Sequence, residues 1–274
     1  MPELPEVETI KGQLQKFIVG KKLAGLEVRF PRLVRPLSPS EASQKTVGAK
    51  IVTVGRHGKY LLLSLDNGQV LVIHLRLTGQ LHYFASEAPP MGTRIAAIFA
   101  FADGSSLFFT DLRGFGTMQL LAQAELQAFL DERTGIDCLD PRFTPDYFWQ
   151  KSQKTKRALK AFLLDQKHFT GVGNIYADEA LHQAKLSPLK ITNTLKRDQS
   201  DRLHQAIMNK LRMGIKLGGA SVSDYEQVTG EKGTMQTALK VYGRRGQPCG
   251  YCGAPLSYLK VGGRGTVYCP HCQP

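Results

Sequence analysis

Apolar and polar residues follow two different periods along the chain, and the change between them separates a β-rich part from a helical part. Apolar residues recur every three to four positions between residues 2 and 18, which predicts an amphipathic helix over that range. Apolar and β-branched segments follow, and two pairs of them flank Asn67-Gly68 and Asp103-Gly104, dipeptides typical of hairpin turns. The predicted strands are residues 23–30, 49–55, 59–65, 69–75, 94–101, 105–112 and 115–121.

Helical spacing returns from about Asp146 onward. It predicts helices over residues 154–166, 174–186 and 200–219, after a linker at 139–144 in which prolines interrupt the pattern. A run of antiparallel strands preceded by one helix favours a two-layer β-sandwich or a flattened barrel. We therefore expect an α+β fold: an N-terminal helix plus two-layer antiparallel β-sandwich, followed by a helical domain.

Charge is distributed unevenly between these parts. Residues 1–146 carry 16 Lys and Arg against 15 Asp and Glu, whereas residues 147–274 carry 20 against 8. A basic region of this kind is typical of nucleic-acid binding, although a basic surface that only aids solubility would give the same count. A membrane surface is less favoured because the basic residues form no juxtamembrane tract.

The sequence also excludes membrane and secreted classes. No apolar run reaches the ~18 residues of a membrane-spanning helix. The acidic, proline-containing N-terminus lacks the basic and apolar regions of a signal peptide. We therefore expect a cytoplasmic globular protein.

Four of the five cysteines lie in the last 26 residues, as two C-x2-C pairs 16 residues apart. Paired knuckles at this spacing hold one tetrahedral Zn²⁺ through four thiolates, here Cys249, Cys252, Cys269 and Cys272. Residues 255–268 between them predict two short strands around a Gly-rich turn. Disulfides are the weaker alternative without a secretion signal. We expect one structural zinc ion in a C-terminal zinc ribbon, which gives predicted domains of 1–138, 139–240 and 241–274.

The first residues carry unusual chemistry. Met1 precedes a small residue, so we expect its removal, which leaves Pro2 with a free secondary amine. An α-amine has a pKa near ~8 against ~10.4 for lysine, so more of it is neutral and nucleophilic at pH 7. Its attack on an electrophilic carbon forms an iminium, and Glu3 could transfer a proton. Prolines and glutamates are also common in a first helical turn, so these residues alone leave both interpretations open.

Seven motifs spread from residue 2 to residue 272 resemble the formamidopyrimidine-DNA glycosylase family. In chain order they are PELPEVET, RHGKYLLL, HLRLTGQ, DLRGFGTM, GVGNIYADEAL, VYGRRGQPC and GRGTVYCPHC. The PELPE opening is similar to the purine-directed branch, whereas the sister family endonuclease VIII usually begins with PEGPE. The resemblance implies a helix–two-turn–helix domain in the helical part, between the sandwich and the zinc ribbon.

It also implies an activity and its residues. The enzyme would flip an oxidised purine, 8-oxoguanine or a formamidopyrimidine, out of duplex DNA and nick the strand by β- and δ-elimination. By position, Pro2 is the nucleophile, Glu3 the general acid, and Glu6 a supporting hydrogen-bond partner. Lys59 corresponds to the family's turn lysine and is the fourth expected catalytic residue, which holds the phosphates that flank the flipped nucleotide and helps to orient the leaving group; a solvated turn lysine is the alternative. A non-enzymatic zinc-ribbon DNA-binding protein is the alternative for the whole chain.

The resemblance further implies a set of DNA contacts. Leu77, Arg113 and Phe115 would fill the space left by the flipped base, although Leu77 and Gly114 depart from the family pattern and Phe115 has a core alternative. Asn174, expected to cap a helix, Arg264 and Lys156 would bind phosphates. His74 and Tyr242 complete the expected DNA contacts, and Ser221 and Tyr225 the base pocket, where Ala220 and Ser223 depart from the pattern. The expected partner is double-stranded DNA that contains oxidised purines or abasic sites, bound by a monomer in the bacterial cytoplasm and nucleoid.

Overall fold

The computed structural model describes residues 1–86 and 94–274, which form two compact units. The first unit contains Met1–Glu132 and Leu217–Thr234, and the second contains Arg133–Lys216 and Met235–Pro274. The segment Leu217–Thr234 therefore groups with the N-terminal residues, although it was expected within the helical part. Hydrogen bonds from the Ala220 and Val228 N–H groups to side chains of the first helix, Glu6 and Gln13, account for this grouping, and the three predicted domains stay a prediction.

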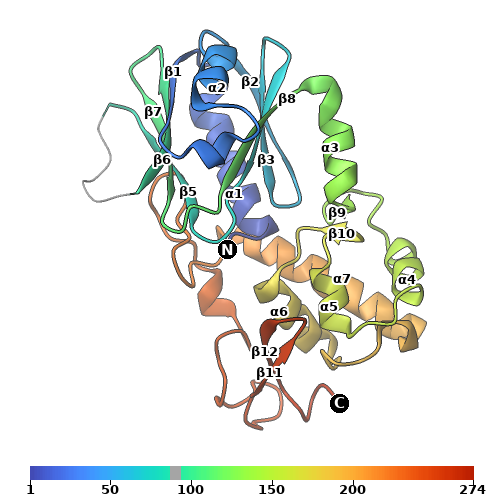
Figure 1. Cartoon of the computed structure of the whole chain (residues 1–274). Coiled ribbons are helices and arrows are strands. Elements are labelled where there is room, and N and C mark those ends of the chain that lie inside the picture. The colour runs from blue at the N-terminus through green and yellow to red at the C-terminus, as the bar shows by residue number, and fades with distance from the viewer. Residues whose placement is uncertain (87–93) are drawn as a thin grey trace. The chain divides into compact units, whose positions relative to one another are not determined.

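The first unit is a two-layer antiparallel β-sandwich with an N-terminal helix (Figure 1). One sheet has the strand order β1-β6-β7-β5 and the other has the order β2-β3-β4-β8. The bounds are α1 (Leu4–Ile18), β1 (Leu23–Val28), η1 (Pro31–Val34), α2 (Pro39–Thr46), β2 (Ile51–His57), β3 (Tyr60–Leu65), β4 (Gln69–His74), β5 (Gly79–Phe84), β6 (Ile95–Phe101), β7 (Ser106–Asp111), β8 (Thr117–Ala122), η2 (Gln123–Glu125) and α3 (Leu126–Arg133).

One apolar core joins helix α1 to both sheets. Helix α1 contributes buried residues at the three- to four-residue spacing seen in the sequence, from Val7 to Ile18. Strand β3 alternates buried and partly buried positions, as a strand with one face in a core does. Burying this apolar stripe against two sheets stabilises α1 far more than its helical propensity does. The position of the chain's first residues is therefore set by the sandwich core.

The predicted hairpins are confirmed, with Gly68 and Gly104 adopting the positive φ that their turns need. Two details differ from the prediction. The first helix begins at Leu4 with Glu3 as its N-cap, so Pro2 precedes it. Strand β5, helix α2 and helix α3 were not predicted. Helix α2 is mostly polar and is defined by a Ser38–Glu41 capping box instead of an apolar stripe.

The second unit combines helices with a two-stranded hairpin at the C-terminal end of the chain (Figure 1). Its helices pack around an aromatic cluster that includes Phe148, Phe162 and Phe169. The bounds are β9 (Ile136–Asp137), α4 (Pro145–Gln153), α5 (Leu159–Leu164), β10 (Phe169–Thr170), α6 (Asn174–Ala184), η3 (Thr192–Thr194), α7 (Arg197–Lys216), η4 (Met235–Ala238), β11 (Ser257–Val261) and β12 (Arg264–Tyr268).

Helix α5 is shorter than predicted, and α4 was not among the predicted helices. The predicted strand pair between the cysteine pairs is confirmed as β11 and β12. Among the described residues, no helix combines the length and apolar character that crossing a membrane requires.

Candidate active site and zinc centre

The N-terminal residues are held by a buried carboxylate. Glu6 is 1% exposed, and its Oε2 accepts a hydrogen bond of 2.8 Å from the backbone N–H of Glu3. Its Oε1 accepts a second hydrogen bond of 2.8 Å from the backbone N–H of Ala220. Glu6 thus fixes the residue that follows Pro2 and also binds the loop that contains Ala220. Pro2 and Glu3 are both buried here, so the sandwich core sets their positions.

Lys59 occupies the turn between β2 and β3 and is only 6% exposed, so it is not a solvated turn lysine. The turn is tied to α1 because Arg56 donates to the Gly58 carbonyl at 2.9 Å and to Glu8 Oε2 at 2.7 Å. Burial alone would raise the pKa of Glu8, but the hydrogen bonds from Arg56 and Lys11 outweigh burial and lower it. The resulting charged cluster keeps the Lys59 turn in one place.

His74 ends strand β4 and is paired with Tyr60 of the neighbouring strand. Burial, together with the charges of Arg76 and Lys59, lowers the pKa of His74 to about 3. The ring is therefore neutral at pH 7. Its Nδ1 accepts a hydrogen bond of 3.0 Å from the Arg76 N–H, so the ring proton lies on Nε2. His74 is thus a neutral donor beside a buried cation.

The buried carboxylate of Asp111 joins the turn that carries Leu77 to the segment that carries Arg113 and Phe115. Thr78 Oγ1 donates to Asp111 Oδ1 at 2.6 Å and accepts from the Arg113 N–H at 3.0 Å. The other oxygen, Oδ2, accepts from the Gly116 N–H at 2.7 Å. One carboxylate therefore orders both segments.

Phe115 is 50% exposed and lies between β7 and β8, so its alternative as a core aromatic on a strand is wrong. The guanidinium of Arg113 lies 5.1 Å from the centre of the Phe115 ring. Gly114 between them has φ +64°, and a Cβ there would approach the Arg32 side chain to 2.1 Å. The departure at Gly114 thus fits a conformation that a side chain would strain.

The loop from Gly218 to Tyr225 is closed by its own hydroxyl groups. Tyr225 is buried and donates to the Gly218 carbonyl at 3.1 Å. Ser221 Oγ donates to the Tyr225 carbonyl at 2.8 Å and accepts from the Gly233 N–H at 3.0 Å. Burial, with a contribution from Glu6, raises the pKa of Tyr225, so the phenol stays protonated. Both expected base-pocket residues thus stabilise the loop itself.

In the second unit, Asn174 is the first residue of α6, and its N-cap is Gly173, so the expectation that Asn174 caps the helix is wrong. The side chain of Asn174 points elsewhere: Nδ2 donates to the Gly265 carbonyl at 3.1 Å. Its Oδ1 is buried without a hydrogen-bond partner among the described residues. Asn174 is therefore bonded to the turn that carries Arg264.

Sequence reasoning missed a buried lysine on α5. Lys160 is fully buried and pairs with Asp178 at 2.6 Å. It also donates to the Gly265 carbonyl at 2.9 Å and to Thr266 Oγ1 at 2.8 Å. Burial raises the pKa of Asp178 to about 6, although Lys160 opposes that shift. The one available signal was a lysine on the apolar face of the segment LKAFLL, where solvent exposure is not expected.

Lys156 is exposed, and so is Arg264 on the turn that Lys160 supports. Tyr242 is positioned by a second missed residue, Glu179 of α6. Glu179 Oε1 accepts hydrogen bonds from the consecutive backbone N–H groups of residues 240, 241 and 242, at 2.8, 2.8 and 3.1 Å. The adjacent carboxylates of α6 therefore hold both the segment before the ribbon and the ribbon hairpin.

The four C-terminal cysteines form one cluster whose sulfur atoms all lie within 4.8 Å of one another. The Sγ atoms of Cys249 and Cys272 are 4.0 Å apart, and those of Cys252 and Cys269 are 3.6 Å apart. A ZnS₄ tetrahedron with Zn–S bonds of about 2.3 Å has sulfur–sulfur edges of about 3.8 Å, whereas a disulfide bond is only about 2.05 Å long. The cluster therefore fits a closed zinc site, and the disulfide alternative is wrong.

Comparison with known proteins agrees with this geometry. Three family models match the chain: the formamidopyrimidine-DNA glycosylase N-terminal domain at residues 1–118, its H2TH domain at 134–226, and the zinc finger found in FPG and IleRS at 246–274. Formamidopyrimidine-DNA glycosylase of Pelotomaculum thermopropionicum is 40% identical over 274 residues, covering 100% of this chain and 99% of that protein. The chain belongs to the formamidopyrimidine-DNA glycosylase family.

Solved structures of this family share the fold. A crystal structure of a mutant Lactococcus lactis FPG with Fapy-dG-containing DNA has a TM-score of 0.93 and 37% identity, covering 99% of each chain. Lactococcus lactis Fpg with DNA containing an abasic site has a TM-score of 0.92, with the same identity and coverage. The predicted fold class and the family resemblance are thus confirmed, and so is one structural zinc ion held by the four cysteines. As a member of this family the chain is a DNA glycosylase of base excision repair.

Proposed function

We propose that this chain is a bifunctional DNA glycosylase and AP lyase that removes oxidised purines, chiefly formamidopyrimidines and 8-oxoguanine, from duplex DNA. The Fapy-dG DNA bound by the Lactococcus lactis relative supports the substrate class. The observation that carries the mechanism is the buried Glu3–Glu6 arrangement directly after Pro2. The Glu3–Glu6 bond is also part of the capping box of α1, and the second bond of Glu6, from the Ala220 N–H, links the start of this helix to the loop that contains Ala220.

The chemistry follows from a neutral amine beside a proton donor. After removal of Met1, the nitrogen of Pro2 attacks C1′ of the damaged nucleotide, and the bond from C1′ to the base breaks as the base leaves. Opening of the sugar gives an iminium, which withdraws electrons and makes the proton on C2′ acidic. Loss of that proton expels the 3′ phosphate, and a further elimination expels the 5′ phosphate. Glu3 moves protons during these steps. The Glu6 carboxylate keeps Glu3 in place by accepting a hydrogen bond from the Glu3 backbone N–H.

Cations and neutral donors on each unit bind the phosphates in this account. Lys59 and the Nε2–H of His74 serve in the first unit, and their burial means that little entropy is lost when they bind. Asn174, Arg264, Lys156 and Tyr242 serve in the second unit. The buried Lys160–Asp178 pair supports the Arg264 turn, which gives this interaction a rigid base.

Base flipping leaves a hole in the stack, which Leu77, Arg113 and Phe115 fill. The half-exposed Phe115 ring and the network around Asp111 support this role, because a side chain that enters DNA must be exposed and yet ordered. We further propose that Ser221 and Tyr225 belong to the base pocket as parts of the loop framework. The protein would act as a monomer on the DNA of the bacterial cytoplasm.

A cleavage assay on three labelled duplexes tests this function. The duplexes carry a formamidopyrimidine, 8-oxoguanine, or a preformed abasic site. The proposal predicts release of the damaged base from the first two duplexes, and strand ends that carry phosphate on both sides of the gap from all three. Release of the base with an intact strand would overturn the lyase part, and binding without base release would leave a DNA-binding protein only. Lys59→Ala should lower cleavage while leaving the fold intact.

A further inference from the structure

A tight turn of residues 226–230 lies against the edge of the first sheet. The Gly230 N–H donates to the Gln227 carbonyl at 2.9 Å, and the Gln227 N–H donates to the Glu231 carbonyl at 2.8 Å, which closes the turn. Strand β5 is the edge strand of its sheet. The N–H of Tyr83 on that edge donates to the Val228 carbonyl at 3.0 Å, so the turn satisfies a donor that an edge strand leaves unpaired.

Helix α1 holds the same turn through one side chain. Gln13 Oε1 accepts from the Val228 N–H at 2.9 Å, and Gln13 Nε2 donates to Gln227 Oε1 at 2.6 Å. These bonds attach the middle of the turn to the sandwich. The Gln13 hydrogen bonds do not involve Glu226, the first residue of the turn, whose side chain makes a separate contact.

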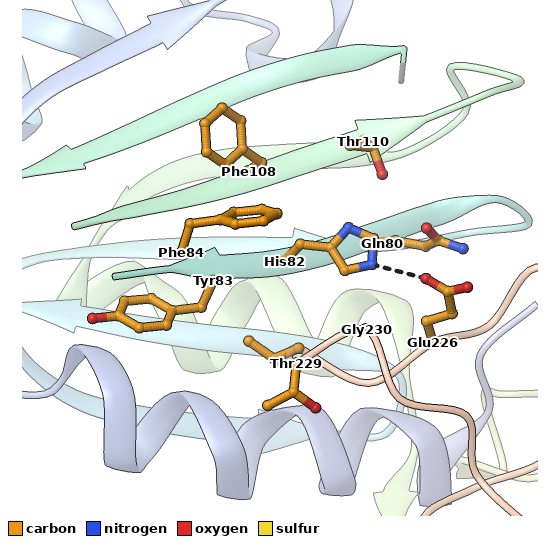
Figure 2. A pocket seen from close by; sticks show the side chains of 10 residues that line it. Gln80, His82, Tyr83, Phe84, Phe108, Thr110, Glu226, Thr229 and Gly230 are labelled. Carbon is orange, nitrogen blue, oxygen red and sulfur yellow. Dashed lines mark ion pairs between the residues drawn. The ribbon is translucent and has the colours of Figure 1, made fainter. Parts of the chain in front are cut away.

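That side chain meets a histidine on the outer face of β5. Leu81 points into the core, so the neighbouring His82 points outward by strand alternation. His82 Nε2 lies 3.3 Å from Glu226 Oε2, and Figure 2 shows the two side chains directed at each other. Burial lowers the pKa of His82, so at neutral pH an uncharged ring faces the Glu226 carboxylate, and within the described residues Nε2 makes no hydrogen bond of good geometry.

A cavity of about 460 Å³ lies beside this pair, between the outer face of the sheet and the turn (Figure 2). Phe84 and Phe108 stand edge to face on the sheet side, with ring centres 5.4 Å apart. Thr229 and Gly230 form the side that belongs to the turn. Val228 of the turn is fully buried in the sandwich core, whereas Glu226 lines the cavity. The His82–Glu226 contact lies on the cavity side of the turn.

Glu226 directly follows Tyr225, the last residue of the loop that begins at Gly218. Tyr225 closes the loop on the Gly218 carbonyl, and Ala220 in the middle of the loop is bonded to Glu6 of the active site. A shift of Glu226 would therefore move Tyr225 and loosen the loop beside the catalytic carboxylates. We propose that His82 and Glu226 are positioning residues that fix the loop 218–225 for holding the damaged base, an inference that rests on the proposed function.

The test combines amide hydrogen exchange of the loop with two kinds of catalysis, in the zinc-loaded, full-length protein. The variants are His82→Ala, Glu226→Ala and the double variant. Glu231→Ala is the matched control, because Glu231 is an exposed glutamate of the same segment. A partly exposed pair of this kind is expected to change local opening about two- to fivefold. Exchange of amides 218–225 should rise by that factor in each single variant and no further in the double variant, with Glu231→Ala unchanged.

Catalysis separates positioning of the base from general damage to the enzyme. Excision of 8-oxoguanine should fall by a similar factor, mainly through KM, whereas cleavage of a preformed abasic site should stay at the wild-type rate because no base has to be held. Unchanged loop exchange would overturn the anchor, and increased exchange with unchanged excision would overturn its link to the base. If the wild type released no base, the proposed function would fail, while the exchange data would still decide whether the pair holds the loop.

Discussion

Because the histidine at the end of β4 is buried and neutral, the free energy of unfolding of the sandwich should fall as the pH is lowered. His74 is 7% exposed and has a pKa of about 3 in the folded protein, against an ordinary value of 6.5. Burial is the main cause, and the charges of Arg76 and Lys59 add to it. Below pH 6.5 the unfolded chain binds a proton at this residue and the folded chain does not. Stability is therefore present above pH 6.5 and is lost as the pH falls toward 3.

The size of the loss follows from the shift. Each pH unit between the two pKa values costs about 1.4 kcal/mol, so lowering the pH from 7.5 to 5.0 removes about 2 kcal/mol of unfolding free energy through His74 alone. His74→Gln lowers stability at pH 7.5 because it removes packing against Tyr60. The same variant should lose about 2 kcal/mol less than the wild type on acidification, since glutamine does not titrate.

Hydrogen exchange of the β3 and β4 amides measures this loss of unfolding free energy within the first unit. Tryptophan fluorescence does not serve there, because the single tryptophan, Trp149, belongs to the second unit. Rates taken at pH 7.5 and 5.0, corrected for intrinsic exchange, give the unfolding free energy of the sandwich at each pH. Acid also lowers the unfolding free energy through His82 and His204, because burial lowers the pKa of each ring. Both histidines are present in the wild type and in His74→Gln, so their contributions cancel in the comparison. An acid loss of equal size in wild type and His74→Gln would refute the assignment of a buried neutral ring.

Three further outcomes follow from the second unit. Lys160→Met leaves the buried Asp178 carboxylate without its cation, so unfolding followed by Trp149 fluorescence should show a loss of about 3–5 kcal/mol; a loss below 1 kcal/mol would contradict the buried pair. His182 Nε2 lies 3.4 Å from Cys249 Sγ, and His182→Phe retains an aromatic ring but removes this hydrogen bond. The variant should release zinc faster to a chromogenic chelator, and the thiolate-to-metal absorption band of its cobalt-substituted form should shift. An unchanged band and release rate would exclude the hydrogen bond. Removing zinc should abolish DNA binding measured by fluorescence anisotropy and should speed amide exchange in residues 246–274. Retained binding would show that the ribbon is not needed for binding DNA.

The elements with strong local signals were predictable from the sequence. Helix α1, both hairpins and the zinc ribbon each follow from a periodic apolar pattern, a turn dipeptide, or paired cysteines. Strand β5 was missed because its apolar residues alternate with polar ones that a cavity-lined outer face accepts, such as Gln80 and His82. The start of α1 was placed two residues early, since proline is compatible with both a cap and a first turn.

The candidate site was only partly predictable, and lying within a motif did not decide the outcome, since Asp111 and Glu179 lie in two of the seven motifs. The roles of Glu6 and Lys59 were expected, whereas Lys160, Glu179 and Asp111 were missed. Each of these three acts through a partner distant in the sequence: Gly265 and Asp178 for Lys160, the amides near Val241 for Glu179, and Thr78 for Asp111. The pairing of a buried charge cannot be predicted from local sequence, because no local pattern indicates which distant donor a carboxylate will contact in the folded chain.

Covalent trapping at the N-terminus tests the central claim most directly. The protein, with Met1 removal and zinc content verified by mass spectrometry, is mixed with a duplex carrying 8-oxoguanine opposite cytosine in the presence of borohydride. The account predicts a reduced protein–DNA adduct that maps to Pro2 and that is strongly diminished in Pro2→Gly. An adduct that maps to a lysine, or no adduct from the verified preparation, would contradict an N-terminal proline nucleophile.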